Sequence, residues 1–179
     1  ASIHVNGGVV CPRANNLDSG IQSGFGFNFP IDQKFFLSLE FDYWKNAAHE
    51  EREKLYNGKL TLTPIWTSLH YDFWRGKNIT SYFFIGVGYV FASFKIGEYI
   101  SIPEVQMNQK VKSGWGYRLG SGVRLKLSRD FCVYGELSYW LRNAEAQTVI
   151  SDMNLGISTH EFSVHLDAVW IQLGILYYF

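Results

Sequence analysis

Apolar residues occupy every second position over much of the chain, the spacing at which successive side chains of a β-strand share one face. In 34–44, one alternate set is Phe35, Leu37, Leu39, Phe41 and Tyr43. The opposite set includes Ser38, Glu40 and Asp42. The same alternation, weakest in the first stretch, is found in 2–11, 20–30, 80–95, 113–127, 131–142 and 169–179. Together with 60–74, these stretches predict about eight strands.

The apolar set of 60–74 changes parity near Thr63 and Pro64. A β-bulge would account for this change, because one extra residue in a strand exchanges its two faces. Proline is also tolerated at bulges. We therefore expect a bulge at these two residues, followed by an apolar face made of Ile65, Leu69, Tyr71 and Phe73.

The connections between the predicted strands alternate in length. Three are tight, at 30–33, 75–79 and 128–130. Four are mostly longer, polar and charged, at 12–19, 45–59, 96–112 and 143–163. In an up-and-down meander, all tight turns lie at one end and all long loops at the other, as in outer-membrane barrels. The sequence predicts one all-β domain, 1–179: an eight-stranded antiparallel up-and-down transmembrane β-barrel with short periplasmic turns and long extracellular loops.

Side-chain volume indicates which face points inward. An eight-stranded barrel has an interior just wide enough for side chains to fill, so the glycine-rich face belongs in the lumen. The large apolar face then points outward, where it would be an excessive exposed patch in water but suits hydrocarbon. Outward aromatic residues also fall near the two ends of the strands, as two girdles would. The pattern therefore favours a membrane barrel over a soluble sandwich.

Composition narrows the class of protein further. The chain has 179 residues, 47% hydrophobic and 17% aromatic, with sixteen basic residues balancing sixteen acidic ones. A neutral chain without a basic patch is not expected to bind nucleic acid. No apolar run reaches the roughly 20 residues that a membrane helix needs. Because the chain begins at Ala1 rather than Met, we expect that a leader peptide has been removed.

The final stretch, VWIQLGILYYF, resembles the C-terminal signature of bacterial outer-membrane β-barrels. It has a final aromatic, Phe179, a second aromatic at Tyr177, and apolar residues such as Ile175 at alternate positions upstream. The whole chain is similar to the small barrels of the OmpA transmembrane domain, OmpX and OmpW type. The resemblance implies that Phe179, Tyr177 and Ile175 are recognised by the barrel-assembly machinery. It also implies a monomer in the outer membrane of a Gram-negative bacterium, with both termini periplasmic.

Motifs for catalysis or metal binding are weak. His49, Glu50 and Glu53 in HEERE lack the second histidine of a metalloprotease helix. His160, Ser163 and His165 lie together before the last strand, but without the close His and Ser spacing of lipid A deacylases. We therefore expect no catalytic residues, no metal and no cofactor.

Inward charges suggest how the lumen is filled. Five charged residues share the inward parity and lie in the middle or lower part of the predicted barrel: Glu40, Asp42, Arg118, Arg124 and Glu136. Because confined charges must be paired, we expect a network that closes the lumen. The tight turn at 128–130 makes Arg124 and Glu136 diagonal neighbours, so we expect these two to pair.

Two further expectations concern the barrel ends. Arg13, Lys45 and Lys95 share the outward parity just beyond the upper girdle, where lipopolysaccharide phosphates would lie. Cys11 faces outward at the loop end and Cys132 inward at the turn end, about a membrane thickness apart. We therefore expect no disulfide between them.

Three classes of function remain open. The first is a non-enzymatic barrel that anchors surface loops for structural, adhesion or interaction roles, with a possible extracellular partner. The second is an OmpW-like conduit for small hydrophobic molecules, with which inward Trp44, Phe94 and Trp140 near the loop end are compatible. The third is a lipid-modifying enzyme at the rim. Turnover of lipid A or phospholipid by purified protein would separate the third class from the others.

Overall fold

A computed structural model describes residues 1–13, 17–48, 58–96, 105–152 and 156–179. Eight antiparallel strands form a closed barrel in the order β1-β11-β8-β7-β5-β4-β3-β2. They are β1 (Ser2–Pro12), β2 (Gly20–Pro30), β3 (Phe35–Ala48), β4 (Gly58–Arg75), β5 (Ile79–Ile96), β7 (Gly114–Lys126), β8 (Phe131–Leu141) and β11 (Ala168–Tyr178). All eight coincide with the stretches of alternation, so the predicted eight-stranded barrel is confirmed.

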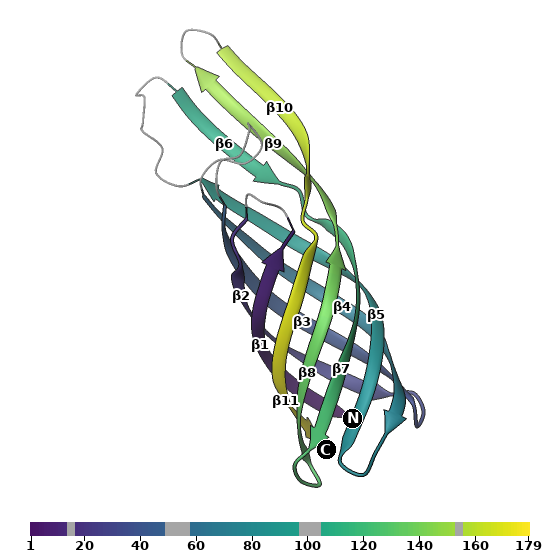
Figure 1. The fold of residues 1–179 in the computed structure, drawn as a ribbon. Helices are drawn as coiled ribbons and strands as arrows, with labels where there is room; N and C mark the ends of the chain where they lie inside the picture. Colours follow the sequence, from purple (N-terminus) through teal and green to yellow (C-terminus); the bar gives the residue numbers. More distant parts are fainter. Residues whose placement is uncertain (14–16, 49–57, 97–104, 153–155) are drawn as a thin grey trace.

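The first and last strands close the barrel. β1 pairs with β11 over eleven residue pairs, from Ser2 opposite Tyr178 to Pro12 opposite Ala168. The two ends of the chain therefore lie side by side at the tight-turn end (Figure 1). Along the strands, buried residues alternate with exposed ones, and in β2, β8 and β11 the exposed set is mainly apolar.

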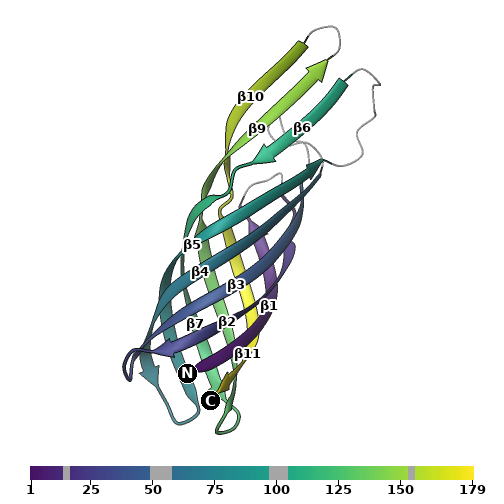
Figure 2. The same cartoon turned by 180° about the vertical axis from the view of Figure 1, so that it is seen from behind.

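A second sheet rises beyond the barrel at the loop end (Figures 1 and 2). It contains β6 (Val105–Val111), β9 (Asn143–Asp152) and β10 (Gly156–His165), in the order β10-β9-β6. The sequence analysis assigned 96–112 and 143–163 to loops, and this part of the prediction is wrong. β6 precedes β7 in the chain, β9 follows β8, and β10 precedes β11. The upper strands therefore continue the antiparallel pairing of these three barrel strands past a short break.

Hydrogen bonds continue through that break. The backbone N–H of Leu166 donates to the carbonyl of Arg142 at 2.9 Å, and that of Arg142 donates to Asp167 Oδ1 at 3.0 Å. Lys112 N–H donates to the carbonyl of Glu145 at 2.8 Å. The chain segments that connect the two sheets are therefore hydrogen-bonded to one another or to β9.

The predicted bulge at Thr63 and Pro64 is also wrong. β4 keeps one register with β3 and β5 through this region, and its register shift lies between Asp72 and Trp74. Leu60 and Leu62 are buried on the same inward parity as Asp72. The apolar set changes parity because the lumen itself becomes apolar toward the loop end, not because the strand rotates. The face of Ile65, Leu69, Tyr71 and Phe73 does point outward.

Outward aromatic side chains contact one another near both ends. At the tight-turn end, Phe131 contacts Tyr177 and Phe73 contacts Phe83, with ring centroids 5.0 and 5.8 Å apart. At the loop end, Tyr89 lies 5.6 Å from Trp115. Between them the exposed side chains are mainly aliphatic. None of the described residues belongs to a helix long and apolar enough to cross a membrane.

Candidate functional site

The middle of the lumen is crossed by a buried ion pair. Arg118 of β7 donates through Nη2 to Glu40 of β3, and through Nε to Ser68 Oγ at 2.9 Å. Glu40 Oε1 also accepts the Ser38 hydroxyl at 2.7 Å. Only 2% of Arg118 and 3% of Glu40 are exposed. Both groups have lost bulk water, so their mutual attraction and these hydrogen bonds replace its solvation.

Aromatic rings complete the surroundings of this cation. The guanidinium carbon of Arg118 lies 5.2 Å from the ring centroids of both Trp66 and Phe84. Both distances allow cation–π attraction, which strengthens where water is excluded. Arg118 is thus held by a carboxylate, a hydroxyl and two aromatic rings contributed by several strands across the barrel.

The other two predicted carboxylates are held by neutral groups. Glu136 accepts the Tyr82 hydroxyl at 2.6 Å and the Gln172 side-chain amide. Asp42 accepts the Gln22 amide at 2.7 Å. Within the described residues, the ion pairs include neither Glu136 nor Asp42. The predicted network is therefore a mixture of ion pairs and amide or hydroxyl hydrogen bonds.

The predicted pair of Arg124 and Glu136 is wrong. The two residues are diagonal neighbours, because Gly122 lies opposite Glu136. Arg124 nevertheless pairs with Asp72 of β4, which also accepts Arg75 Nη2 at 2.7 Å. The guanidinium carbon of Arg124 lies 4.5 Å from the Phe36 ring centroid. The long Arg124 side chain reaches past β5 to this acid of β4, which the sequence analysis did not include among the inward charges.

Four tryptophans fill the lumen on the loop side of the ion pair. Trp44, Trp66, Trp140 and Trp170 are buried, and their rings meet nearly edge to face at centroid separations of 5.0 to 6.4 Å. This tryptophan cluster continues into apolar residues nearer the rim, among them Leu60, Leu62 and Phe94. Trp44, Phe94 and Trp140 were expected to point inward, but Trp66 and Trp170 were missed. The inward parity of the apolar residues in β4 could have revealed Trp66.

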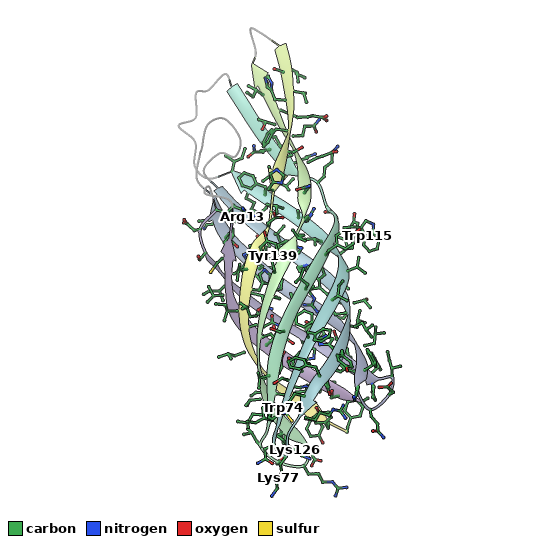
Figure 3. All side chains as sticks on the ribbon, turned by 45° about the vertical axis from the view of Figure 1, so that its right-hand side comes forward. Arg13, Trp74, Lys77, Trp115, Lys126 and Tyr139 are labelled. Atoms are coloured by element: carbon green, nitrogen blue, oxygen red, sulfur yellow. The ribbon has the colours of Figure 1, made fainter. Side chains whose placement is uncertain are left out.

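The predicted outward cations lie at the loop end. Lys45 and Lys95 are exposed, and a third exposed lysine, Lys59, lies directly opposite Lys95 on β4. The sequence analysis missed Lys59 because it assigned 45–59 to a loop. Arg13 donates a hydrogen bond to Tyr139, and Figure 3 shows the two side by side at the upper part of the barrel. Three lysines on adjacent strands therefore form one basic patch, with Arg13 placed apart from them.

The predicted assembly residues lie on the outer face of β11 or at its end. Ile175 and Tyr177 point outward, and Phe179 is 72% exposed. The Phe179 N–H donates to the carbonyl of Ala1 at 3.2 Å. Phe179 thus has little packing of its own, while its backbone touches the strand that closes the barrel.

The remaining predicted motifs form no catalytic arrangement in the described part of the chain. His160 Nε2 lies 3.0 Å from Ser158 Oγ, while His165 Nδ1 lies 2.6 Å from Asn143 Oδ1. Ser163 is exposed on β10 opposite Glu145. His49, Glu50 and Glu53 lie outside the described residues. Among the residues that are described, no group of three or more His, Cys, Asp or Glu side chains could hold a metal ion.

The two cysteines are both free. Cys11 is exposed at the loop end and Cys132 is buried at the tight-turn end. The expectation that they form no disulfide is therefore confirmed.

Comparison with known proteins supports the fold. No protein-family model and no curated protein matches the chain. Among solved structures, the outer membrane protein OprG from Pseudomonas aeruginosa is 17% identical with a TM-score of 0.76, covering 98% of this chain and 94% of that one. Neisserial surface protein A is 13% identical with a TM-score of 0.65, covering 99% and 96%. The outer membrane protein W of E. coli is 15% identical with a TM-score of 0.52, covering 99% and 97%. This chain therefore has the fold of the small eight-stranded outer-membrane β-barrels.

Proposed function

We propose that this protein is a non-enzymatic outer-membrane barrel that holds the sheet of β6, β9 and β10 outside the cell. The observation that carries the proposal is the closed barrel with exposed apolar side chains around it. A closed barrel satisfies every backbone group in hydrocarbon, and the apolar outer face needs that solvent. The buried lumen side chains leave no room for an aqueous channel.

The upper sheet is the part that we assign to interaction. Within the described residues, β10 pairs on one side only, with β9, and Figures 1 and 2 show nothing beyond its other edge. The sequence of β10, GISTHEFSVH, contains no lysine or proline, the residues that commonly protect such edges from pairing. We assign the role of adhesion or partner contact to this sheet because its free edge can accept an extended segment.

The orientation can be tested with single cysteines. Replacing both native cysteines with serine and adding Ile157→Cys, at a side chain 75% exposed on β10, places one thiol on the upper sheet. The matched control is Arg129→Cys, at an exposed residue in the tight turn between β7 and β8. A membrane-impermeant maleimide should label the first variant in intact cells and the second only after permeabilisation. Labelling in the reverse order, or of neither, would contradict the proposal.

Lipopolysaccharide is the lipid partner that the basic patch supports. Lys45, Lys59 and Lys95 are exposed on adjacent strands near the loop-end aromatics. Directly opposed lysines repel each other, and a phosphate between them would remove that repulsion. Replacing all three with glutamine should lower the lipopolysaccharide that co-purifies with the barrel, while Arg13→Gln tests the separate cation. Unchanged co-purification in both variants would exclude specific binding.

One observation favours a second candidate, a binder of small hydrophobic molecules. In the loop-side half of the lumen, the tryptophan cluster and aliphatic residues such as Leu60 and Leu62 form one continuous apolar cluster. A fatty acid that quenches tryptophan fluorescence saturably, and less so in Trp140→Leu, would support this function. Assaying the same samples for phospholipid or lipid A turnover tests the non-enzymatic assignment.

A further inference from the structure

The tight-turn end of the barrel holds an open cavity of about 540 Å³. Its wall is formed by the turns between β2 and β3, between β4 and β5 and between β7 and β8, together with the ends of β1 and β11. Figure 1 shows these segments converging at the lower end of the barrel. The volume is within the range of small-ligand sites. We call this cavity the basic mouth.

Cationic side chains outnumber anionic ones in the basic mouth. Its lining includes five basic residues: Arg75, Lys77, Arg124, Lys126 and Arg129. It includes two acidic residues, Asp32 and Asp72. Since the whole chain has no net charge, this excess is local. A cleft with charges of one sign and low-dielectric walls concentrates ions of the opposite sign.

Both acids already have partners. Asp72 pairs with Arg75 and Arg124 at the inner end of the cavity. Asp32 accepts the backbone N–H groups of Lys34 and Phe35 at 2.6 and 2.8 Å. Those two hydrogen bonds lower the pKa of Asp32, so its carboxylate is kept in the turn. Among the described residues, neither acid forms an ion pair with Lys77, Lys126 or Arg129.

Three cations are therefore left for a ligand. Within the described residues, no ion pair involves Lys77, Lys126 or Arg129. Two of them are neighbours, because the Lys126 N–H donates to the carbonyl of Asn78 at 2.7 Å. Figure 3 shows Lys77 and Lys126 together at the tight-turn end. Arg129 approaches from the turn between β7 and β8.

The chemistry of these groups favours phosphate. A single carboxylate would neutralise one of the three cations, whereas a diphosphate or a phosphate dianion can meet two or more. Lysine serves as a point charge for phosphate, and arginine adds a planar fork that binds two oxygens. We propose that the basic mouth binds phosphate groups through Lys77, Lys126 and Arg129, with Arg124 fixed behind them by Asp72. The phosphate comes from a soluble compound or from an anionic lipid headgroup.

Calorimetric titration of the refolded chain with inorganic pyrophosphate tests the site. The chain is kept in a neutral maltoside detergent, which contains no phosphate. The unmodified protein should show saturable binding that weakens as sodium chloride rises. The triple variant Lys77→Gln, Lys126→Gln, Arg129→Gln should bind pyrophosphate at least about tenfold more weakly. Absence of saturable binding by the unmodified protein would overturn the proposal.

A charge-matched control separates this site from general attraction. The variant Lys34→Gln, Lys110→Gln, Lys112→Gln removes the same charge at exposed residues outside both the basic mouth and the lysine patch of the loop end, and it should keep the affinity. Equal losses in both triple variants would show diffuse electrostatics and overturn the site. A third variant, Lys77→Arg, Lys126→Arg, Arg129→Lys, keeps the charges and should bind. Heat-dependent gel mobility checks that each variant folds.

Cys132 provides a second readout, because it lines the basic mouth. In a Cys11→Ser background, a negatively charged methanethiosulfonate reagent should modify Cys132 faster than a positively charged one. Pyrophosphate should slow that reaction, and the triple variant of the mouth should lose the preference. Equal rates for the two reagents in the unmodified mouth would contradict a positive site.

The source of the phosphate is separated by changing the lipid. In nanodiscs of phosphatidylcholine, pyrophosphate binding should resemble that in detergent. If replacing the phosphatidylcholine with phosphatidylglycerol weakens pyrophosphate binding, the lipid competes for the site, and the site takes lipid headgroups. If pyrophosphate binding is unchanged, the site takes soluble phosphate. Either result supports the basic mouth, and loss of pyrophosphate binding in both lipids would contradict it.

Discussion

Arg118 and Glu40 join opposite sides of the lumen, from β7 and β3, through a buried charge-assisted hydrogen bond. No strand pairing brings these residues together, since β5 and β4 lie between their strands in the barrel order. Each is therefore positioned by its own strand, and the pair braces the barrel across its interior.

Removing either partner of this pair should be costly. We expect Glu40→Ala and Arg118→Ala each to lower the free energy of unfolding by about 3 to 5 kcal/mol, because a buried charge is left alone. The double variant should cost less than the two single changes added together. Urea unfolding in lipid vesicles, followed by gel mobility, measures these values.

The pair of Arg124 and Glu136 is the matched comparison for that experiment. Arg124 has its ion pair with Asp72, and Glu136 accepts the Tyr82 hydroxyl, so the two are linked only indirectly, through the Tyr82 ring that lies 4.7 Å from the Arg124 guanidinium carbon. Their double-mutant coupling should therefore be smaller than that of Arg118 and Glu40. Strict additivity at Glu40 and Arg118 would contradict a direct pair and indicate charges solvated one by one.

The lumen should not conduct ions. The tryptophan cluster and the buried ion pair fill the interior of an eight-stranded barrel, which has no space for an aqueous channel beside them. Planar-bilayer recording of the unmodified protein should show no large, steady open channels. A stable open level would move the proposed function toward a pore.

The tryptophan cluster should contribute strongly to stability. Trp140 contacts Trp44, Trp66 and Trp170, and Trp140→Ala should cost about 3 to 5 kcal/mol. Trp115→Ala is the control, because Trp115 is 64% exposed on the outer face and contacts Tyr89. Trp115→Ala should lower the free energy of unfolding by clearly less than Trp140→Ala in the same assay. Similar losses of stability in both variants would mean that burial of Trp140 in the lumen does not contribute to the free energy of unfolding.

The sequence was sufficient to predict the barrel because alternation reports which face a residue occupies. It placed Glu40, Arg118 and Glu136 in the lumen, since a period of two is insensitive to barrel tilt. It did not reveal their partners, because contacts such as that of Arg124 with Asp72 join strands that do not pair. Contacts of this kind depend on the tilt and stagger of all eight strands.

The misplaced bulge and the missed upper sheet share a physical origin in the assumption that each strand carries an apolar face that points outward. Leu60 and Leu62 face inward beside Trp44, so the change of parity in β4 marked an apolar lumen and not a bulge. In β9 of the upper sheet, small residues such as Ala144 and Ala146 alternate with polar ones, and no strong apolar stripe results. A strand outside the membrane has no lipid-facing side, so its sequence does not need the apolar alternation that marks the barrel strands.

Phe179 should matter more for assembly than for stability. It is the last residue of this sequence and has a mostly exposed side chain, so its deletion removes little packing. If the assembly machinery recognises it, the deletion variant should accumulate unfolded in the periplasm yet refold normally in detergent. Leu127→Ala, which removes another exposed apolar side chain at the same end, should assemble in cells. Equal impairment of the deletion variant in both settings would reduce Phe179 to packing.

Two adjacent glycines of β1 offer a sharp test of the barrel seam. A methyl group on Gly8 would fall on the carbonyl oxygen of Ile171 and within 2.8 Å of the Cα of Gln172, both backbone atoms of β11. On Gly7, the nearest atom would be the carbonyl oxygen of Gln22 at 3.8 Å, an ordinary contact. Backbone atoms of a paired strand have little freedom to move aside, so only the first substitution should disturb the pairing of β1 with β11.

We therefore expect Gly8→Ala to lower the free energy of unfolding by about 1 to 3 kcal/mol, the usual cost of overpacking. Gly7→Ala should be neutral or slightly stabilising, since alanine loses less backbone entropy on folding than glycine. The two variants add the same atoms one residue apart, so differences in composition cancel. Unfolding midpoints in one detergent, with hydrogen exchange at the amides of β1 and β11, would compare them. Faster exchange at the seam in Gly7→Ala than in Gly8→Ala would contradict the close approach of β1 and β11 at Gly8.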